Sequence, residues 1–122
     1  MRILVVDDEV DVRDLFSQRF RREVKRGELT IDFAHSGEEA MKLLVQTERP
    51  DYVLILSDIN MPGMSGLELL KEIKAMNAKQ DVLMVTAYGD GNNYNKAVEF
   101  GATVFLTKPV DFSELRKQIF KS

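Results

Sequence analysis

Continuous apolar runs in the chain predict strands that are buried on both faces of a sheet. Such runs lie within the predicted strands at residues 2–6, where the run follows Arg2, at 53–58, where it ends in Ser57 and Asp58, and at 82–85. Residues 29–33 instead alternate apolar and polar side chains, a pattern that is typical of a strand at the edge of a sheet. A fifth run, at residues 103–106, completes a set of five predicted strands.

After four of the predicted strands, apolar residues recur at helical spacing and predict an amphipathic helix. The four apolar faces are Val12, Leu15, Phe16 and Phe20; Ala40, Leu43 and Leu44; Leu69, Leu70, Ile73 and Met76; and Phe112, Leu115 and Ile119. After the fourth strand we expect a short, weak helix at residues 94–100, which is the fourth in chain order. The capping-box spacings of Ser36 with Glu39 and of Ser65 with Glu68 support the second and third helices. The first helix is expected to end before residue 27, and Gly101 is expected to stop the fourth.

Five strands alternating with five helices predict an α/β fold. This spacing implies right-handed crossovers and a parallel sheet with helices on both faces. Because the polar strand at residues 29–33 belongs at an edge, we expect a doubly wound five-stranded parallel sheet in the order 2-1-3-4-5. This arrangement is flavodoxin-like, (βα)5. Its switch point lies between the first and third strands, where ligands bind at the carboxyl ends of strands.

Length, composition and charge fit one globular domain spanning residues 1–122. The chain is 44% apolar and 30% charged. It contains no cysteine, which excludes disulfides and thiolate metal sites and favours a reducing compartment, so we expect a cytoplasmic location. No apolar run is long enough to cross a membrane, and no signal-peptide pattern is present. The net charge of −3 argues against direct nucleic-acid binding.

Two further features have ordinary structural explanations. Residues 19–26 are rich in Arg and Lys at the end of the first predicted helix, where cations favour the negative end of the dipole. We therefore favour a solvated helix face over a phosphate-binding patch for this stretch. His35 is the only histidine, so a histidine metal cluster or a His-based triad has no second histidine to use, and we expect a surface loop position.

Polar side chains stand at the ends of four of the five predicted strands. Asp7 and Asp8 follow the first strand, Asp58 ends the third, Thr86 ends the fourth and Lys108 follows the fifth. Because the strands are parallel, these residues fall on the same edge of the sheet. Three crowded carboxylates repel one another, and a hard divalent cation such as Mg²⁺ relieves that repulsion. An aspartate between a metal ion and an ammonium could accept a phosphoryl group, because both cations stabilise its equatorial oxygens during transfer.

These residues make the chain resemble the receiver domain of two-component response regulators over essentially its whole length, similar to the receivers of chemotaxis response regulators. The resemblance is carried by Val5-Val6-Asp7-Asp8-Glu9, Asp58-Ile59-Asn60-Met61-Pro62-Gly63 with Gly66, Thr86-Ala87, Gly101-Ala102 and Lys108-Pro109. The occurrence of these motifs together and in order makes the combination specific.

The resemblance implies a role for each residue at the strand ends. Asp58 is implied to be the phosphoacceptor, which takes its phosphoryl group from the phosphohistidine of a histidine kinase or a phosphotransfer protein. Mg²⁺ is implied to bind Asp8 directly and Asp7 largely through water, with Asp58 as a further ligand. The backbone carbonyl of Asn60 is implied to complete the metal site.

Further implied roles concern the phosphorylated state. Lys108 is implied to pair with the phosphoryl oxygens, and the peptide bond after it is usually cis in the family. Thr86 and Phe105 are implied to be the switch, with Phe105 swinging inward as Thr86 moves to the phosphoryl group. The side chains of Asn60 and Tyr88 occupy the two positions that tune hydrolysis. Because Tyr88 is bulky, we expect a phosphorylated state that is not unusually short-lived.

The implied output face consists of the helix at 94–100, the strand at 103–106 and the helix that begins near 112. Glycine and asparagine give the first of these helices a poor start, so we expect residues 89–100 to be mobile without phosphate and to order on activation. Homodimerisation through the two helices is left open.

The chain contains no recognisable output domain, so output is expected through a partner surface or a domain outside this chain. Residues 86–90 and 108–112 are similar to those of receivers attached to nucleotide cyclases and other non-DNA outputs. Since the final residues fall within a predicted helix, a complete protein and a domain of a longer one both remain open.

Three alternative functions are less compatible with the sequence. A haloacid-dehalogenase-like phosphatase needs an acid two positions after the nucleophile, where this chain has Asn60. A flavodoxin-like flavin binder needs a phosphate-binding loop after the first strand, where Asp7, Asp8 and Glu9 repel phosphate. A degenerate receiver that acts only as an interaction module is disfavoured, because every expected site position is occupied. We therefore expect a signalling switch that catalyses only its own phosphotransfer and slow self-dephosphorylation, not an enzyme with an external substrate.

Overall fold

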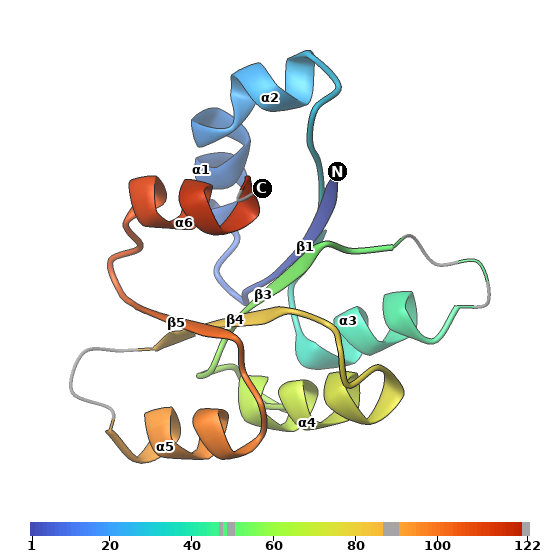
Figure 1. Cartoon of the computed structure of the whole chain (residues 1–122), viewed down its shortest axis with the longest axis vertical. Coiled ribbons are helices and arrows are strands. Elements are labelled where there is room, and N and C mark those ends of the chain that lie inside the picture. Colours follow the sequence, from blue (N-terminus) through green and yellow to red (C-terminus); the bar gives the residue numbers. More distant parts are fainter. Residues whose placement is uncertain (47, 49–50, 87–90, 121–122) are drawn as a thin grey trace.

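The computed structural model describes residues 1–46, 48, 51–86 and 91–120 and contains one five-stranded sheet (Figure 1). The strands are β1 (Arg2–Val6), β2 (Thr30–Ala34), β3 (Leu54–Asp58), β4 (Val82–Thr86) and β5 (Val104–Thr107). All neighbouring strands are parallel, in the order β2-β1-β3-β4-β5. The predicted doubly wound order is confirmed, with the polar strand β2 at an edge.

Helices cover both faces of the sheet. They are α1 (Asp11–Arg19), α2 (Arg21–Lys25), α3 (Gly37–Leu44), α4 (Gly66–Met76), α5 (Gly91–Glu99) and α6 (Phe112–Ile119). Figure 1 shows α1, α2 and α6 on one face and α3, α4 and α5 on the other. Within the described part of the chain, no helix is both long and apolar enough to cross a bilayer.

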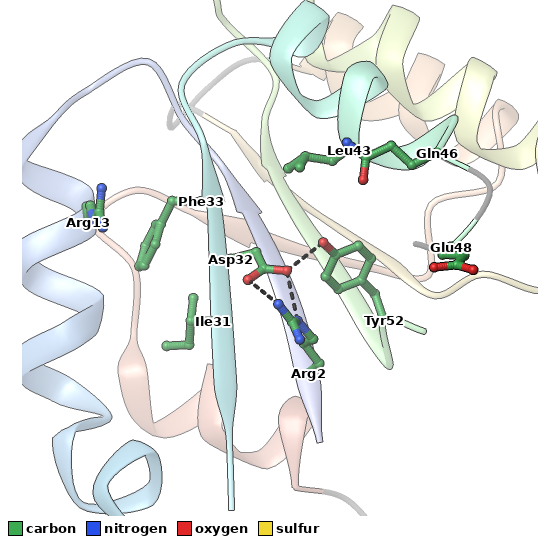
Figure 2. A pocket seen from close by; sticks show the side chains of 9 residues that line it. All are labelled: Arg2, Arg13, Ile31, Asp32, Phe33, Leu43, Gln46, Glu48 and Tyr52. Atoms are coloured by element: carbon green, nitrogen blue, oxygen red, sulfur yellow. Dashed lines mark hydrogen bonds and ion pairs between the residues drawn. The ribbon is translucent and has the colours of Figure 1, made fainter. Parts of the chain in front are cut away.

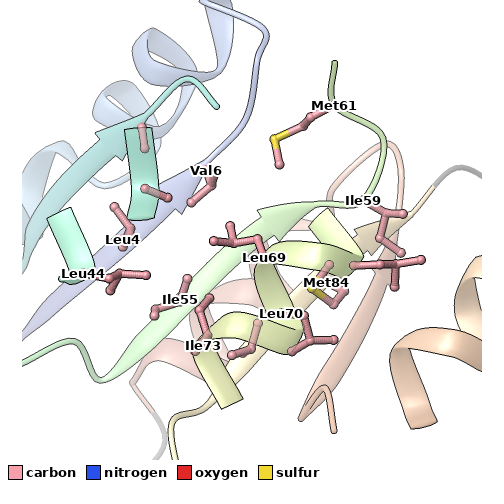
Figure 3. Close-up of a cluster of buried hydrophobic side chains, with 14 of the residues drawn as sticks. Leu4, Val6, Leu44, Ile55, Ile59, Met61, Leu69, Leu70, Ile73 and Met84 are labelled. Carbon is pink, nitrogen blue, oxygen red and sulfur yellow. The ribbon is translucent and has the colours of Figure 1, made fainter. Parts of the chain in front are cut away.

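The sheet divides the hydrophobic core into two clusters, because successive strand residues point to opposite faces. The cluster beneath α3 and α4 includes Leu4, Ile55, Leu69, Leu70 and Met84 (Figure 3). The cluster beneath α1 and α6 includes Ile3, Phe16, Phe20, Leu83 and Leu115. The central strands contribute to both clusters, which explains why their sequences are continuously apolar.

The first predicted helix is two helices. Phe20, between α1 and α2, has φ −108° and ψ 19°, outside the helical range. Its ring is fully buried, stacks on Phe16 and packs against Phe112. The hydrogen bonds nevertheless continue across the break, since the Phe20 N–H bonds to the Phe16 carbonyl and the Val24 N–H to the Phe20 carbonyl. Helical spacing could not reveal this break, because Phe20 keeps the apolar periodicity.

Three residues predicted to be buried are exposed. Val53 is 47% exposed because β3 begins one residue later. Met76 is the last residue of α4 and is 42% exposed. Leu15 of α1 is 41% exposed and borders an open pocket rather than the core. Each lies at the margin of the buried face, where the apolar pattern alone does not distinguish core from rim.

Helix α5 begins at Gly91, earlier than the predicted start at residue 94. The N–H groups of a first turn have no partner within the helix, so weak helix formers cost least at these positions. The helix ends at Glu99, one residue before the predicted end, and is followed by the predicted stop Gly101, whose φ is +91°; the Ala102 N–H bonds to the Ala97 carbonyl. Mobility of this segment without phosphate stays a prediction, and residues 89 and 90 lie outside the described residues.

A polar network joins the edge strand β2 to β1 and to the residue Tyr52 (Figure 2). Arg2 donates from Nε and Nη2 to the two carboxylate oxygens of Asp32, at 2.9 and 3.0 Å. The Tyr52 hydroxyl donates to Asp32 Oδ2 at 2.7 Å. Burial raises the pKa of Asp32, but the hydrogen bonds from Arg2 and Tyr52 and the charge of Arg2 outweigh it and hold that pKa below its ordinary value.

Asp32→Asn is expected to lower the free energy of unfolding at pH 7 by about 1–2 kcal/mol, because the amide lacks the charge that Arg2 binds. Since the folded state lowers the pKa of Asp32, the carboxylate stabilises the fold above its unfolded-state pKa and loses this effect as pH falls through the folded-state pKa. Urea unfolding of both proteins at pH 7 and at lower pH should therefore show a shrinking difference. The exposed Asp51→Asn is the control, and an equal loss there at pH 7 would contradict the assignment.

Candidate functional site

The carboxyl ends of four strands meet at one edge of the sheet. Their register pairs Val6 with Ser57, Asp58 with Val85, and Thr86 with Thr107. The residues that end these strands, or directly follow them, therefore lie side by side. The Lys108 N–H bonds to the Thr86 carbonyl at 2.9 Å, which extends the β4–β5 pairing to the lysine.

Asp58 is the buried carboxylate of this edge, with 3% of its surface exposed. Its Oδ2 accepts a hydrogen bond from Lys108 Nζ at 2.7 Å, and its Oδ1 accepts one from the Asn60 N–H at 3.2 Å. Both oxygens thus have a donor, and the two donors fix the orientation of the carboxylate. Buried polar groups without partners are costly, so these two donors stabilise the buried side chain of Asp58.

Asp7, Asp8 and Asp58 form an acidic cluster in which one carboxylate oxygen from each lies within 4.8 Å of the others. Burial raises the pKa of Asp7; the hydrogen bond from the Glu9 N–H opposes this, and the charge of Asp58 adds to it. The pKa of Asp7 is raised above its ordinary value, so burial and the nearby charge of Asp58 disfavour the ionised form of this carboxyl group. An all-oxygen donor set of this charge fits a hard divalent cation such as Mg²⁺.

Lys108 supplies the positive charge of the site. Its Nζ lies 2.7 Å from Asp58 Oδ2 and 3.6 Å from Glu9 Oε1. Burial lowers the pKa of Lys108, but the hydrogen bond and charge of Asp58, and the charges of Asp7 and Glu9, raise it above its ordinary value. The side chain of Lys108 is therefore protonated and positively charged at neutral pH. The interaction of Glu9 with Lys108 was not predicted from the sequence. The position of Glu9 directly after Asp7 and Asp8, in the same loop, was the available signal.

The backbone of Gly66 lies in close contact with the residues at the end of β3. Gly66 packs so closely that a Cβ there would lie 2.0 Å from the Asp58 carbonyl oxygen and 2.7 Å from Ile59 Cα. The Gly66 N–H also bonds to the Ile59 carbonyl at 2.8 Å, so the start of α4 is fastened to the end of β3. The Lys108–Pro109 peptide bond is cis, as the resemblance implied.

Thr86 lies at the same edge of the sheet as the acidic cluster, whereas Phe105 lies farther back, within β5. Thr86 ends β4 at the same edge as Asp58 and is 5% exposed. Phe105 lies within β5, packs against the core cluster beneath α4, and its ring centroid is 4.6 Å from that of Tyr94 on α5. Phe105 is thus placed between the sheet and α5 rather than in the acidic cluster. Tyr88 lies outside the described residues, and Asn60 is exposed next to the cluster.

Comparison with known proteins shows relatives along nearly the whole chain. The family model of the response regulator receiver domain matches residues 3–120. The chain is 36% identical over 120 residues to sporulation initiation phosphotransferase F of Bacillus subtilis, covering 98% of this chain and 91% of the relative. It is 37% identical over 120 residues to the response regulator protein PilR of Pseudomonas aeruginosa, covering 97% of this chain but only 25% of the relative.

Among solved structures, the response regulator protein TrrA of Thermotoga maritima, in complex with Mg²⁺-BeF, is similar at a TM-score of 0.77. The two are 34% identical, and the match covers 98% of this chain and 96% of that one. The chain therefore belongs to the receiver domain family of two-component response regulators. The function of this family is signalling through a phosphorylatable aspartate, and its members bind Mg²⁺ at an acidic pocket.

Proposed function

We propose that Asp58 is the phosphoacceptor of this receiver domain, which we take to span residues 1–122. The observation that carries the proposal is the position of its buried carboxylate, 2.7 Å from the Lys108 ammonium and within 4.8 Å of Asp7 and Asp8. The donor is the phosphohistidine of a histidine kinase or phosphotransfer protein. An oxygen of Asp58 attacks phosphorus, the P–N bond breaks, and the imidazole leaves.

The proposed Mg²⁺ ligands are Asp7, Asp8, Asp58 and the backbone carbonyl of Asn60. When bound, the metal supplies a second positive charge that stabilises the phosphoryl oxygens during transfer. Lys108 holds its proton at neutral pH and orients Asp58 Oδ2, while the Asn60 N–H holds Oδ1. Burial of Asp58 keeps bulk water from the reacting carboxylate.

We further propose that Thr86 and Phe105 transmit the phosphorylated state. The Thr86 hydroxyl bonds to the phosphoryl group, and Phe105 moves inward behind it. Because the Phe105 ring packs on Tyr94, this movement changes the packing of α5 against β5. The output face in this proposal comprises α5, β5 and α6 and contacts an output domain or partner protein. Homodimerisation through α5 and α6 is an alternative use of the same face.

Self-dephosphorylation is proposed to be slow and to be tuned by the side chains of Asn60 and Tyr88. No further catalytic activity is proposed for this domain. The cytoplasmic location stays a prediction of the cysteine-free sequence.

Beryllofluoride, a phosphoryl mimic, is expected to bind only when both Mg²⁺ and Asp58 are present. In amide NMR spectra, the mimic should shift the resonances of Thr86 and Phe105 in the wild type, and Asp58→Asn should abolish these shifts. Asp8→Asn should weaken Mg²⁺ binding by about tenfold or more, because loss of a ligand costs at least as much as loss of an outer-shell partner. Asp11→Asn, an exposed acid in the first turn of α1, is the control. Unchanged shifts in Asp58→Asn would contradict the proposal.

A further inference from the structure

Five arginines surround a cavity of about 510 Å³ between α1, α2 and α6. They are Arg19, Arg21, Arg22, Arg26 and Arg116, and we call this feature the arginine cavity. It lies at the opposite end of α1 from the loop that carries Asp7 and Asp8, as the position of α2 shows (Figure 1). The cavity is therefore separate from the phosphoacceptor site.

Two of the five arginines are already held in place by the protein. Arg116 forms an ion pair with the buried carboxylate of Glu23 and donates from Nη2 to the Arg19 carbonyl at 2.8 Å. Its guanidinium also lies over the Phe20 ring, 4.8 Å from the centroid, and Arg19 lies over the Phe112 ring at 5.2 Å. The guanidinium of Arg116 is thereby fixed at the wall of the cavity, and the charge of Glu23 is already paired.

The other three arginines, which line the same cavity, are exposed, and of the three only Arg22 acts on the charge of Glu23. Arg21, Arg22 and Arg26 take part in none of the ion pairs found within the described residues. The remaining acid at the cavity is the exposed Glu28. This concentration of charge does not follow from a basic composition, since the whole chain carries a net charge of −3. Like charges that line one cavity repel one another, and a bound anion would relieve the repulsion.

We propose that the arginine cavity binds a compact polyphosphate, a chain of two or three phosphates that is either free or carried by a nucleotide. Guanidinium groups match phosphate oxygens with paired hydrogen bonds, and the volume suits a small molecule. Every described residue that lines the cavity is polar or charged. The cavity thus lacks the apolar anchors that a peptide interface uses, and no aromatic side chain is among its described lining residues.

The position of Arg116 is what separates this proposal from a simple solvated helix face. The stretch at residues 19–26 alone is compatible with cations at the end of a helix. Arg116 comes from α6, 90 positions beyond Arg26, and lines the cavity while it contacts Glu23 of α2 and the Arg19 carbonyl at the end of α1. The cavity is therefore lined by segments that are distant in the sequence, and not by one helix end alone.

Isothermal titration calorimetry with sodium tripolyphosphate tests the proposal. The buffer contains no divalent cation, so that the acidic cluster at Asp58 repels the ligand. We expect one-site binding to the wild type, weakened by about tenfold or more in the double variant Arg22→Gln, Arg26→Gln, since two charge-assisted contacts are lost. The matched control is Lys42→Gln, Lys96→Gln, which removes the same charge from exposed sites on the other face of the sheet. Circular dichroism establishes that both double variants are folded.

Two further ligands distinguish the sources of the anion. ATP should bind with an affinity similar to that of tripolyphosphate, and a hexaglutamate peptide should bind more weakly than either. Absence of binding to the wild type would overturn the proposal, as would equal weakening in the two double variants. Tighter binding of the peptide would assign the cavity to an acidic protein partner. Binding of ATP about tenfold tighter than tripolyphosphate would show that the base is recognised and would overturn the assignment to the phosphate chain alone.

Discussion

Gly66→Ala is expected to destabilise the domain by about 3 kcal/mol, because the new methyl group has no space. An alanine Cβ at this position would lie 2.0 Å from the Asp58 carbonyl oxygen and 2.7 Å from Ile59 Cα. Both atoms belong to backbone that is fixed by β3, so neither can rotate away as a flexible side chain would. The start of α4 must then move away from Asp58, and we expect slower phosphorylation as well as lower stability.

A matched control exists in the same chain. Gly91 is the first residue of α5, as Gly66 is of α4, but a Cβ at Gly91 would meet no described atom within 4 Å. Gly91→Ala should therefore be neutral or stabilise the domain by about 0.5–1 kcal/mol, because alanine restricts the unfolded chain. Urea unfolding of the two variants measures the difference. Equal stabilities would show that the close approach at Gly66 has no energetic consequence.

Lys108→Ala is expected to slow phosphorylation by acetyl phosphate by about 100-fold or more, the usual cost of losing one group that stabilises a transition-state oxygen. The ammonium lies 2.7 Å from Asp58 Oδ2, so in the proposed mechanism it lies beside the incoming phosphoryl group. Its raised pKa keeps it charged at neutral pH. Removing it also leaves Asp58 buried beside Asp7 and Asp8 without their cation, so the carboxylates should repel one another more strongly.

Lys117→Ala is the control for Lys108→Ala. Lys117 is an exposed residue of α6 whose Nζ is 3.9 Å from Glu114, and surface pairs of this kind contribute little. The phosphorylation rate of Lys117→Ala should match that of the wild type. Mass spectrometry at successive times measures both rates through the growth of the phosphoryl adduct. If the phosphorylation rate of Lys108→Ala were within a few-fold of the rate of Lys117→Ala, Lys108 would have no role in phosphoryl transfer.

The strand order and the meeting of the acids at one edge could be predicted from the sequence for a physical reason. Strands buried on both faces require continuous apolar residues, and the half-exposed edge strand β2 requires alternation. Once the strands are parallel, the residues that end them must share an edge. The sequence alone could therefore predict that Asp7, Asp58 and Lys108 lie close together.

Other features depend on contacts between distant segments and could not be predicted. The break at Phe20 conserves the helical spacing and arises where that ring packs against Phe112. Arg116 joins the arginines of α2 only because α6 packs beside α1. The clash at Gly66 requires knowledge of where the Asp58 carbonyl points. The apolar and polar pattern of a short segment does not contain information about these contacts between distant segments.

Intact-mass spectrometry after incubation with acetyl phosphate tests the phosphoacceptor most directly. The wild type, Asp58→Ala and the control Asp11→Ala are compared with and without Mg²⁺. We expect a single phosphoryl adduct on the wild type and on Asp11→Ala only when Mg²⁺ is present, and none on Asp58→Ala. An adduct that persists on Asp58→Ala, or the absence of any adduct on folded wild-type protein with Mg²⁺, would contradict the assignment of Asp58.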